Sequence, residues 1–293
     1  MLREHVFESF DGTRLTYRVY GADAEAPWLV ICNGYGGTFS AWAEVMPLLV
    51  PHLRVLIWDY RGQHKSETPR DRRLLRIADN VRDLDRLLAH EGVERFVLAG
   101  WSVGVQVALE AYRRDPSRVL GLALLNGAHE RVLRNVLAGR LGPLGRPMVQ
   151  AASRVMGRAL PPLRPALKRF ARSRVAPPLA ERLGMITGRP ATFPEAFSAL
   201  LDLDWQVYLG MAVLADDHRT EDWLPEVKAP VLITAGAKDA LTPPSIARRA
   251  AARLPDAEYV EFPRGTHYTL MEFPAEVADH LLRFVRRVID ATS

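Results

Sequence analysis

The chain has 293 residues, of which 48% are hydrophobic and 25% charged, the usual composition of a globular protein with a full core. Its net charge of +5 is mild, and no apolar run approaches the roughly 20 residues that a membrane span requires. The charged start, Met1 to Glu8, is unlike a signal peptide, and the single Cys32 excludes an internal disulfide, so we expect a cytoplasmic protein.

The first sixty residues predict four strands, which are His5–Phe10, Leu15–Tyr20, Trp28–Cys32 and Arg54–Trp58. Asp11-Gly12 is a hairpin signal, so the first two strands are expected to pair antiparallel. Cys32 lies inside the third run, which favours a buried and unreactive thiol.

Strands and helices alternate in most of the remaining chain. Further strands are predicted at Phe96–Ala99, Val119–Leu125, Val231–Ala235 and Glu258–Glu261, with helices from Ser102, near Pro244–Leu254 and from Pro274. These strands are apolar throughout, as expected when helices cover both faces of a parallel sheet. The pattern predicts a doubly wound α/β fold with a mostly parallel, eight-stranded sheet that binds ligands at the carboxyl ends of its strands.

The alternation stops between residues 128 and 224, where the composition shifts to Arg, Leu, Ala and Pro. The pattern there is helical, and prolines interrupt it at Pro143, Pro147, Pro161-Pro162, Pro165 and Pro177-Pro178. We interpret this stretch as a helical cap inserted into a core domain that consists of residues 1–127 and 225–293.

The predicted cap is strongly basic. Residues 131–200 contain thirteen Lys or Arg and two acids, Glu181 and Glu195. Basic helices with interleaved apolar residues can lie on an anionic membrane, so a weak membrane contact is one interpretation. We favour the other, a solvated outer face on which arginine stems cover apolar surface. No nucleic-acid partner is expected.

The most informative motif is Gly100-Trp101-Ser102-Val103-Gly104, between a predicted strand and a predicted helix. A serine in such a tight turn has a strained backbone that pushes its hydroxyl out of the sheet edge, and only small residues fit two positions away on either side. The N–H of Val103 then lies at a helix N-terminus, where it can face an oxyanion.

Two further residues are predicted at the same sheet edge. Asp239 follows the strand Val231–Ala235, and His267 follows the last predicted strand. A serine hydroxyl needs a base to take its proton, and the base needs a carboxylate to orient it. Three such residues after three separate strands therefore predict nucleophilic catalysis by Ser102.

With these motifs the chain resembles the α/β-hydrolase superfamily over essentially its full length, as a capped, serine-nucleophile member similar to esterases and lipases. The order Ser102, Asp239, His267 is the family's order, and the resemblance implies that they act as nucleophile, acid and base. The stretch Asn33-Gly34-Tyr35-Gly36-Gly37 matches the family's loop after the third strand, which implies that the N–H of Tyr35 joins that of Val103 in the oxyanion hole.

Two stretches depart from the family's pattern. Asn33 stands where the family often has His, and Gln63 and His64 replace a His and a Gly in the stretch Trp58–Ser66, so the latter loop can follow a different path. Asp59 and Arg61 in that stretch are interpreted as structural. Some relatives carry the acid after the sixth strand, where this chain has Asn126-Gly127; this favours Asp239.

The resemblance implies a hydrolase that cleaves carboxylic esters through an acyl-enzyme, since relatives that open epoxides or displace halide carry Asp at the position of Ser102. No cofactor is expected, and no metal, because the eight His and the one Cys form no close ligand cluster. The same three residues also serve carbon–carbon bond hydrolases, thioesterases, lactonases and perhydrolases. Some relatives are non-catalytic ligand-binding proteins.

A hydrophobic ester substrate is expected from the residues near the motifs. Trp101, Tyr35, Phe39 and Tyr268 are the candidate substrate-binding side chains. The predicted cap adds apolar candidates, which are Met148, Met156, Phe170, Phe193, Phe197, Trp205 and Tyr208. The oligomeric state has no signal in the sequence.

Overall fold

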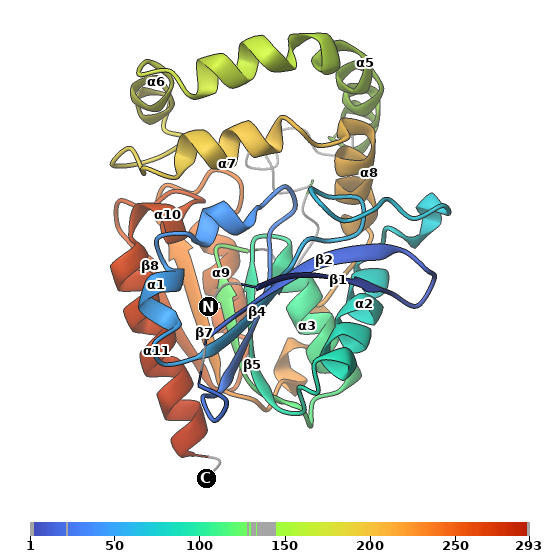
Figure 1. Ribbon diagram of the computed structural model, residues 1–293. Helices are drawn as coiled ribbons and strands as arrows, with labels where there is room; N and C mark the ends of the chain where they lie inside the picture. The colour runs from blue at the N-terminus through green and yellow to red at the C-terminus, as the bar shows by residue number, and fades with distance from the viewer. Residues whose placement is uncertain (1–2, 22, 128, 130–132, 134–144, 292–293) are drawn as a thin grey trace.

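The computed structural model describes residues 3–21, 23–127, 129, 133 and 145–291 (Figure 1). Eight strands form one sheet in the order β1-β2-β4-β3-β5-β6-β7-β8. They are β1 (Arg3–Glu8), β2 (Arg14–Tyr20), β3 (Trp28–Cys32), β4 (Arg54–Trp58), β5 (Phe96–Trp101), β6 (Val119–Leu125), β7 (Val231–Gly236) and β8 (Ala257–Phe262). β2 pairs antiparallel with β1 and β4, and the other neighbours are parallel. The predicted fold class is confirmed.

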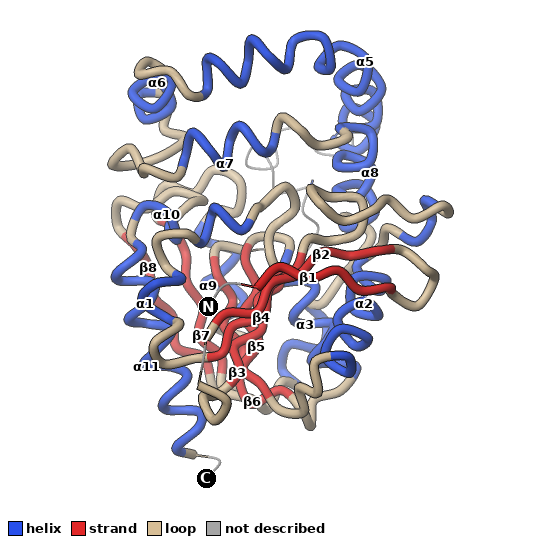
Figure 2. Tube along the Cα trace, in the orientation of Figure 1, coloured by secondary structure: helices blue, strands red, loops and turns tan. Residues whose placement is uncertain are grey.

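Helices cover both faces of this sheet (Figure 2). α2 (Ile77–His90), α3 (Gly104–Arg114) and α9 (Pro244–Ala251) pack on one face, and α1 (Met46–Leu49) and α11 (Pro274–Asp290) on the other. The short helices η1 (Phe39–Trp42), η2 (Arg72–Leu74) and α10 (Thr269–Glu272) belong to the loops between these elements.

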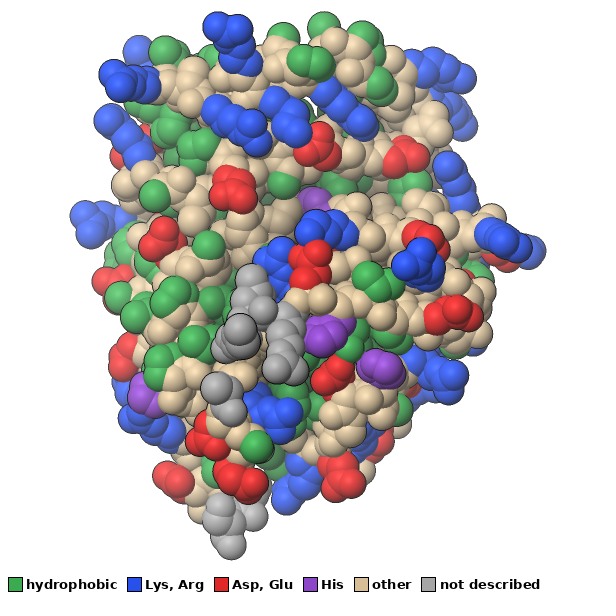
Figure 3. Space-filling model, in the orientation of Figure 1, with side chains coloured by type: hydrophobic (Ala, Val, Ile, Leu, Met, Phe, Trp, Pro, Cys, Tyr) green, Lys and Arg blue, Asp and Glu red, His purple; other side chains and the backbone are tan. Residues whose placement is uncertain are grey.

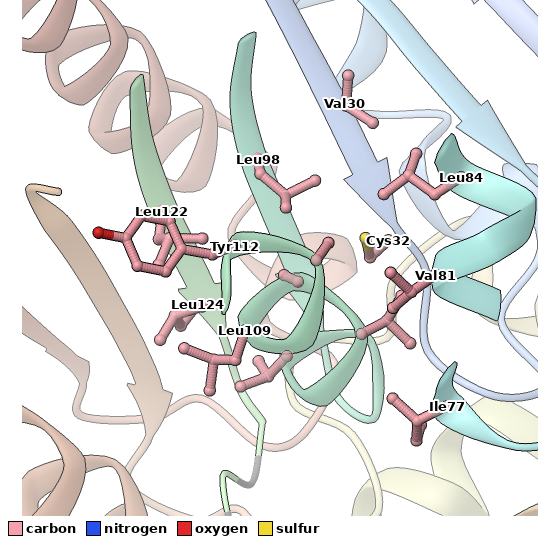
Figure 4. Close-up of a cluster of buried hydrophobic side chains, with 14 of the residues drawn as sticks. Val30, Cys32, Ile77, Val81, Leu84, Leu98, Leu109, Tyr112, Leu122 and Leu124 are labelled. Atoms are coloured by element: carbon pink, nitrogen blue, oxygen red, sulfur yellow. The ribbon is translucent and has the colours of Figure 1, made fainter. Parts of the chain in front are cut away.

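Alternation along the central strands divides the core into two halves. In β3, Val30 and Cys32 join the cluster that contains α2 and α3, whereas Leu29 and Ile31 join the cluster that contains α11. Figure 4 shows part of the first cluster, with Cys32 among the side chains between the sheet and the helices. Burial raises the pKa of the Cys32 thiol, which fits the expected unreactive state.

Every element described between β6 and β7 is helical: α5 (Gly145–Ala171), α6 (Ala176–Arg182), α7 (Phe193–Leu200), α8 (Trp205–Ala215) and η5 (Glu221–Glu226). α5 to α8 form a layer at one end of the sheet, with α5 packed on α8 and α7 (Figure 1). The proposed cap boundary at residue 128 lies outside the described residues, and the division into two domains stays a prediction.

The prediction that prolines break the helices of this layer is wrong for Pro161, Pro162 and Pro165. All three lie inside α5, which runs for 27 residues. Figure 1 shows α5 changing direction along its length, as expected where prolines remove backbone donors. Pro177 and Pro178 instead begin α6, where a missing N–H costs little.

Among the described residues, no single helix is long and apolar enough to cross a membrane. α7 and α8 together have the length and apolar composition of a membrane span, but they are bent by 94° relative to each other.

A buried ion pair fixes the loop after β4, as interpreted from the sequence. The Arg61 side chain is fully buried and donates to both carboxylate oxygens of Asp83 in α2. It also donates to Asp11 at 3.1 Å, in the turn between β1 and β2, and to the carbonyl oxygen of Leu74 at 3.0 Å. Arg61 therefore ties together the hairpin, the loop and α2.

Replacing Arg61 by Met leaves the Asp83 carboxylate buried without its partner. We expect the free energy of unfolding to fall by about 3–5 kcal/mol, measured by urea unfolding. The double variant Arg61→Met/Asp83→Leu removes both fully buried charges and leaves only the partly exposed Asp11 carboxylate without its partner, so it should recover much of the loss. The exposed Arg86→Gln serves as control. If Arg61→Met is as stable as the parent, the ion pair does not hold the fold together.

Candidate active site

Ser102 lies in a turn of two residues between β5 and α3 with a φ of 57°, in the left-handed region. The glycines around it are required by close backbone contacts. A Cβ on Gly104 would lie 2.0 Å from the carbonyl oxygen of Cys32, and one on Gly100 would lie 2.5 Å from that of Gly104. The turn that the sequence predicts is present, and it holds the Ser102 hydroxyl at the carboxyl end of the sheet.

The structure brings the three predicted residues together. The Nε2 atom of His267 lies 2.9 Å from the Oγ atom of Ser102, and its Nδ1 atom lies 2.8 Å from Oδ2 of Asp239. Both distances are within hydrogen-bond range, so the imidazole links hydroxyl and carboxylate. His267 and Asp239 are buried, and Ser102 is half-buried. A base is therefore in position to take the serine proton.

The environment of Asp239 keeps its carboxylate ionised. Its Oδ1 atom accepts the backbone N–H groups of Leu241 at 2.9 Å and Thr242 at 2.8 Å. Burial by itself would raise the pKa of Asp239, but attraction to His267 and the hydrogen bonds from His267 and Thr242 outweigh it. The pKa of Asp239 is therefore lowered, which suits a group that must stay negative beside an imidazole.

Two residues near Asp239 were missed by the sequence analysis. The Thr242 hydroxyl lies 2.8 Å from Oδ2 of Asp239 and 3.2 Å from Nδ1 of His267. The Asn126 amide lies 3.4 Å from the same Oδ2 and donates to the carbonyl oxygen of Thr266 at 3.1 Å. The spacing Asp239-x-x-Thr242 before two prolines is a turn signal that could have identified Thr242.

Close contacts between loops set the position of His267. A Cβ on Gly236 would lie 2.2 Å from the carbonyl oxygen of Thr266, so only glycine allows the loops after β7 and β8 to approach this far. The Trp101 indole donates to the carbonyl oxygen of His267 at 3.2 Å. Glu272 accepts from the backbone N–H of Thr266 at 2.8 Å. These contacts hold the backbone at Thr266 and His267, and this fixes the position of the imidazole.

The backbone N–H groups of Tyr35 and Val103 donate no hydrogen bond within the described part of the chain, and both residues line the cavity above Ser102. Side chains fix the loop that carries Tyr35. Asn33 accepts the N–H of Gly34 at 3.0 Å, and Gln63 accepts that of Gly36 at 2.7 Å. Asn33 and Gln63, which both depart from the family's pattern, therefore hold this loop in place. They leave the N–H of Tyr35 available to bind an oxyanion.

A cavity of about 330 Å³ lies between the sheet edge and the helical layer. Except for His267 and tyrosines, none of its lining side chains is ionisable. The lining comprises Gly34, Tyr35, Gly36, Gly37, Thr38, Ala41, Trp101, Ser102, Val103, Leu133, Val149, Phe193, Ala196, Phe197, Leu200, Tyr208, Leu209, Ala212, Leu241, Thr242, His267, Tyr268 and Met271. The site can therefore exclude water and hold an uncharged, apolar group.

Three of the four candidate substrate-binding residues line this cavity: Trp101, Tyr35 and Tyr268. Phe39 does not line this cavity, and its contact with substrate stays a prediction. Residues three apart share a face of a 3₁₀-helix, and Thr38 and Ala41 occupy the face of η1 toward the cavity. The Phe39 ring points elsewhere, with the Arg18 guanidinium 4.1 Å from its centre.

The apolar candidates of the helical layer divide in the same way. Phe193, Phe197 and Tyr208 line the cavity, whereas Met156 and Trp205 do not. Met148 and Phe170 lie on the outer surface, 50% and 43% exposed. No group of three or more His, Cys, Asp or Glu within the described ranges is placed to hold a metal ion.

Comparisons with known proteins agree with this geometry. Residues 27–274 match the family model for the alpha/beta hydrolase fold. The chain is 30% identical over 268 residues to the pimeloyl-[acyl-carrier protein] methyl ester esterase of Aromatoleum aromaticum, covering 86% of this chain and 95% of the relative. It is 27% identical to a Caulobacter protein provisionally named carbamate hydrolase RutD, covering 92% of this chain and 95% of that one.

A solved structure of a hydrolase from Pseudomonas aeruginosa superposes with a TM-score of 0.78 at 25% identity, over 97% of this chain and 98% of that one. The eight-stranded sheet, the turn at Ser102 and these similarities lead to one conclusion: the chain belongs to the α/β-hydrolase family and is a hydrolase.

Proposed function

We propose that the protein is a serine hydrolase that cleaves uncharged carboxylic esters with hydrophobic acyl or alcohol groups through an acyl-enzyme. The observation that carries the proposal is the continuous contact of Ser102, His267 and Asp239, with distances of 2.9 and 2.8 Å. Membership of the hydrolase family and the esterase named above support it.

In the proposed reaction, His267 takes the proton of Ser102 as its Oγ atom attacks the ester carbonyl carbon. The carbonyl oxygen becomes an oxyanion, which the N–H groups of Tyr35 and Val103 bind; one such donor contributes about 3 kcal/mol. When the C–O bond breaks, His267 gives the proton to the leaving alcohol. It then takes a proton from water as the water oxygen attacks the acyl-enzyme. When the bond between the acyl carbon and Oγ breaks, His267 returns this proton to Ser102 and the acid leaves.

The proposed substrate is uncharged because of the cavity lining. Apart from His267, no basic side chain faces the cavity among its lining residues, so a second carboxylate on the substrate would find no partner there. Burying an unpaired charge costs several kcal/mol. Phe193, Phe197 and Met271 instead offer apolar contacts.

Other acyl compounds are alternative substrates, since one relative is named an esterase and another is provisionally named a carbamate hydrolase. Thioesters, lactones, perhydrolysis and carbon–carbon bond cleavage use the same serine and base, and nothing in the lining favours one of them over an ester.

Labelling with a fluorophosphonate tests the nucleophile. We expect stoichiometric modification of the native protein at Ser102, found by peptide mass spectrometry, and none in Ser102→Ala. The exposed Ser117→Ala is a matched control and should label normally. Absence of modification in the folded native protein would reject Ser102 as an activated nucleophile.

Replacing Asp239 by Asn tests the acid. The change removes the charge beside His267 and favours the wrong imidazole tautomer, so we expect kcat to fall on the order of 10⁴-fold with little change in fold, by analogy with other triads. The exposed Asp256→Asn is the control for loss of a carboxylate. Turnover near that of the parent would mean that another group orients His267.

Matched substrates test the preference for uncharged esters. We expect kcat/KM for p-nitrophenyl hexanoate to exceed that for mono-p-nitrophenyl adipate on the order of 100-fold, because the adipate carries a terminal carboxylate into an apolar cavity. Equal values, or a preference for the charged ester, would contradict the assignment.

A further inference from the structure

The outward face of α5 and α6 is unusually apolar. Eleven large hydrophobic side chains are exposed among the described residues, and eight of them lie between Met148 and Met185. Leu163 is 53% exposed and Leu183 is 66% exposed. Such clustering on a surface marks an interaction site, whereas exposed hydrophobic residues scattered singly need no explanation.

In α5 these side chains recur at a regular interval. Met148, Val155, Leu163 and Phe170 are seven or eight residues apart, close to two helical turns, so they lie on similar sides of the helix. Val149, the residue after Met148, is half-buried and lines the catalytic cavity. α5 is therefore apolar on its inner side and again along an outer stripe, which its packing on α7 and α8 leaves uncovered.

The same face is cationic and largely without counter-charges. Arg146 and Lys168 pair with Asp217 and Asp202. Six other arginines are exposed and have no hydrogen bond or ion pair within the described part of the molecule; they are Arg154, Arg158, Arg169, Arg172, Arg174 and Arg182. Figure 3 shows Lys and Arg side chains along this layer, with hydrophobic side chains between them.

The sequence alone favoured a solvated outer face, but the exposed apolar residues of this layer change that preference. We propose that the outward face of α5 and α6 docks on an anionic lipid surface. The apolar side chains enter the boundary between headgroups and acyl chains, and the six arginines pair with lipid phosphates. A layer that is apolar and basic at once has the charge and the apolar area that such a surface binds. A nucleic acid would use the arginines but would leave the aliphatic stripe in water.

Docking in this way would place the catalytic cavity next to the lipid. Val149 of α5 and several residues of α7 and α8 form its roof, on the inner side of the docking layer. Esters that dissolve in the bilayer would then be concentrated near the site. The docking itself does not depend on the proposed ester chemistry, and binding can be measured without any substrate.

Vesicle co-sedimentation of the full chain tests the proposal. We expect binding to phosphatidylcholine vesicles that contain phosphatidylglycerol, and much weaker binding to phosphatidylcholine alone. The binding should weaken strongly with salt, because the screening length falls from about 10 Å at 0.1 M to about 3 Å at 1 M. Equal binding to both vesicles, or none to the anionic ones, would overturn the proposal.

The triple variant Arg158→Gln/Arg169→Gln/Arg172→Gln should bind anionic vesicles on the order of 100-fold more weakly, since each basic side chain near an anionic surface strengthens binding roughly fivefold. Its turnover of a soluble ester should not change, because none of the three lines the cavity. Unchanged vesicle binding would contradict the docking face.

A matched triple variant on the core tests whether position matters beyond net charge. Arg86, Arg253 and Arg286 are exposed and have no ion pair among the described residues. Their replacement by Gln should leave vesicle binding within about twofold of the parent, since exposed charges far from the lipid are screened. An equal loss in both triple variants would show that only net charge matters.

A fluorescent probe locates the contact. Cys32 is fully buried, so an environment-sensitive dye attached to Leu163→Cys labels one site. Its emission should shift to the blue with anionic vesicles, whereas a dye at Leu48→Cys, on α1 and 41% exposed in the native protein, should not respond. If duplex DNA shifts the dye and vesicles do not, the face binds another polyanion and the assignment to lipid is wrong.

Discussion

The close approach of backbone segments at the carboxyl ends of the central strands is the constraint on which the site depends. Gly104 lets the start of α3 touch the backbone at the end of β3, and Gly236 lets the loop after β7 touch the loop after β8. Ser102 takes up a left-handed conformation between these contacts, which costs about 1–3 kcal/mol. Sheet packing offsets that cost and keeps the hydroxyl within reach of His267.

The two sides of the His267 imidazole differ in polarity. Asp239 is buried, and hydrogen bonds from its own turn and from Thr242 keep it ionised. The cavity on the other side of His267 is almost entirely apolar. Charge is thus confined to the side of the imidazole away from the cavity, where it orients the proposed base without favouring charged ligands.

Much of the sheet and of the candidate site could be predicted from the sequence, because both depend on local patterns. The bounds of Trp28–Cys32, Arg54–Trp58 and Val119–Leu125 match those of β3, β4 and β6, since short apolar runs between turn residues are distinct strand signals. The glycines around Ser102 revealed its turn for steric reasons. Asp239 and His267 each follow a predicted parallel strand, and the carboxyl ends of parallel strands lie at the same edge of a sheet.

The sequence analysis was wrong or incomplete where packing between distant segments determines the structure. Whether Phe39 or Ala41 faces the cavity depends on the phase of a short 3₁₀-helix. α5 continues through its prolines while packed on α7 and α8, which local propensity does not include. The contact of Asn126 with Asp239 joins residues 113 positions apart. The cytoplasmic location and the cap boundaries stay predictions.

The central claim is that one cavity holds the nucleophile, the base and the two backbone donors in a single reactive geometry. The most direct test is a crystal structure of the protein inhibited by a neutral alkylphosphonate ester. The account predicts phosphorus bonded to Oγ of Ser102, with the phosphoryl oxygen within hydrogen-bond distance of the N–H groups of Tyr35 and Val103. An adduct on another residue, or a phosphoryl oxygen turned away from both amides, would contradict it.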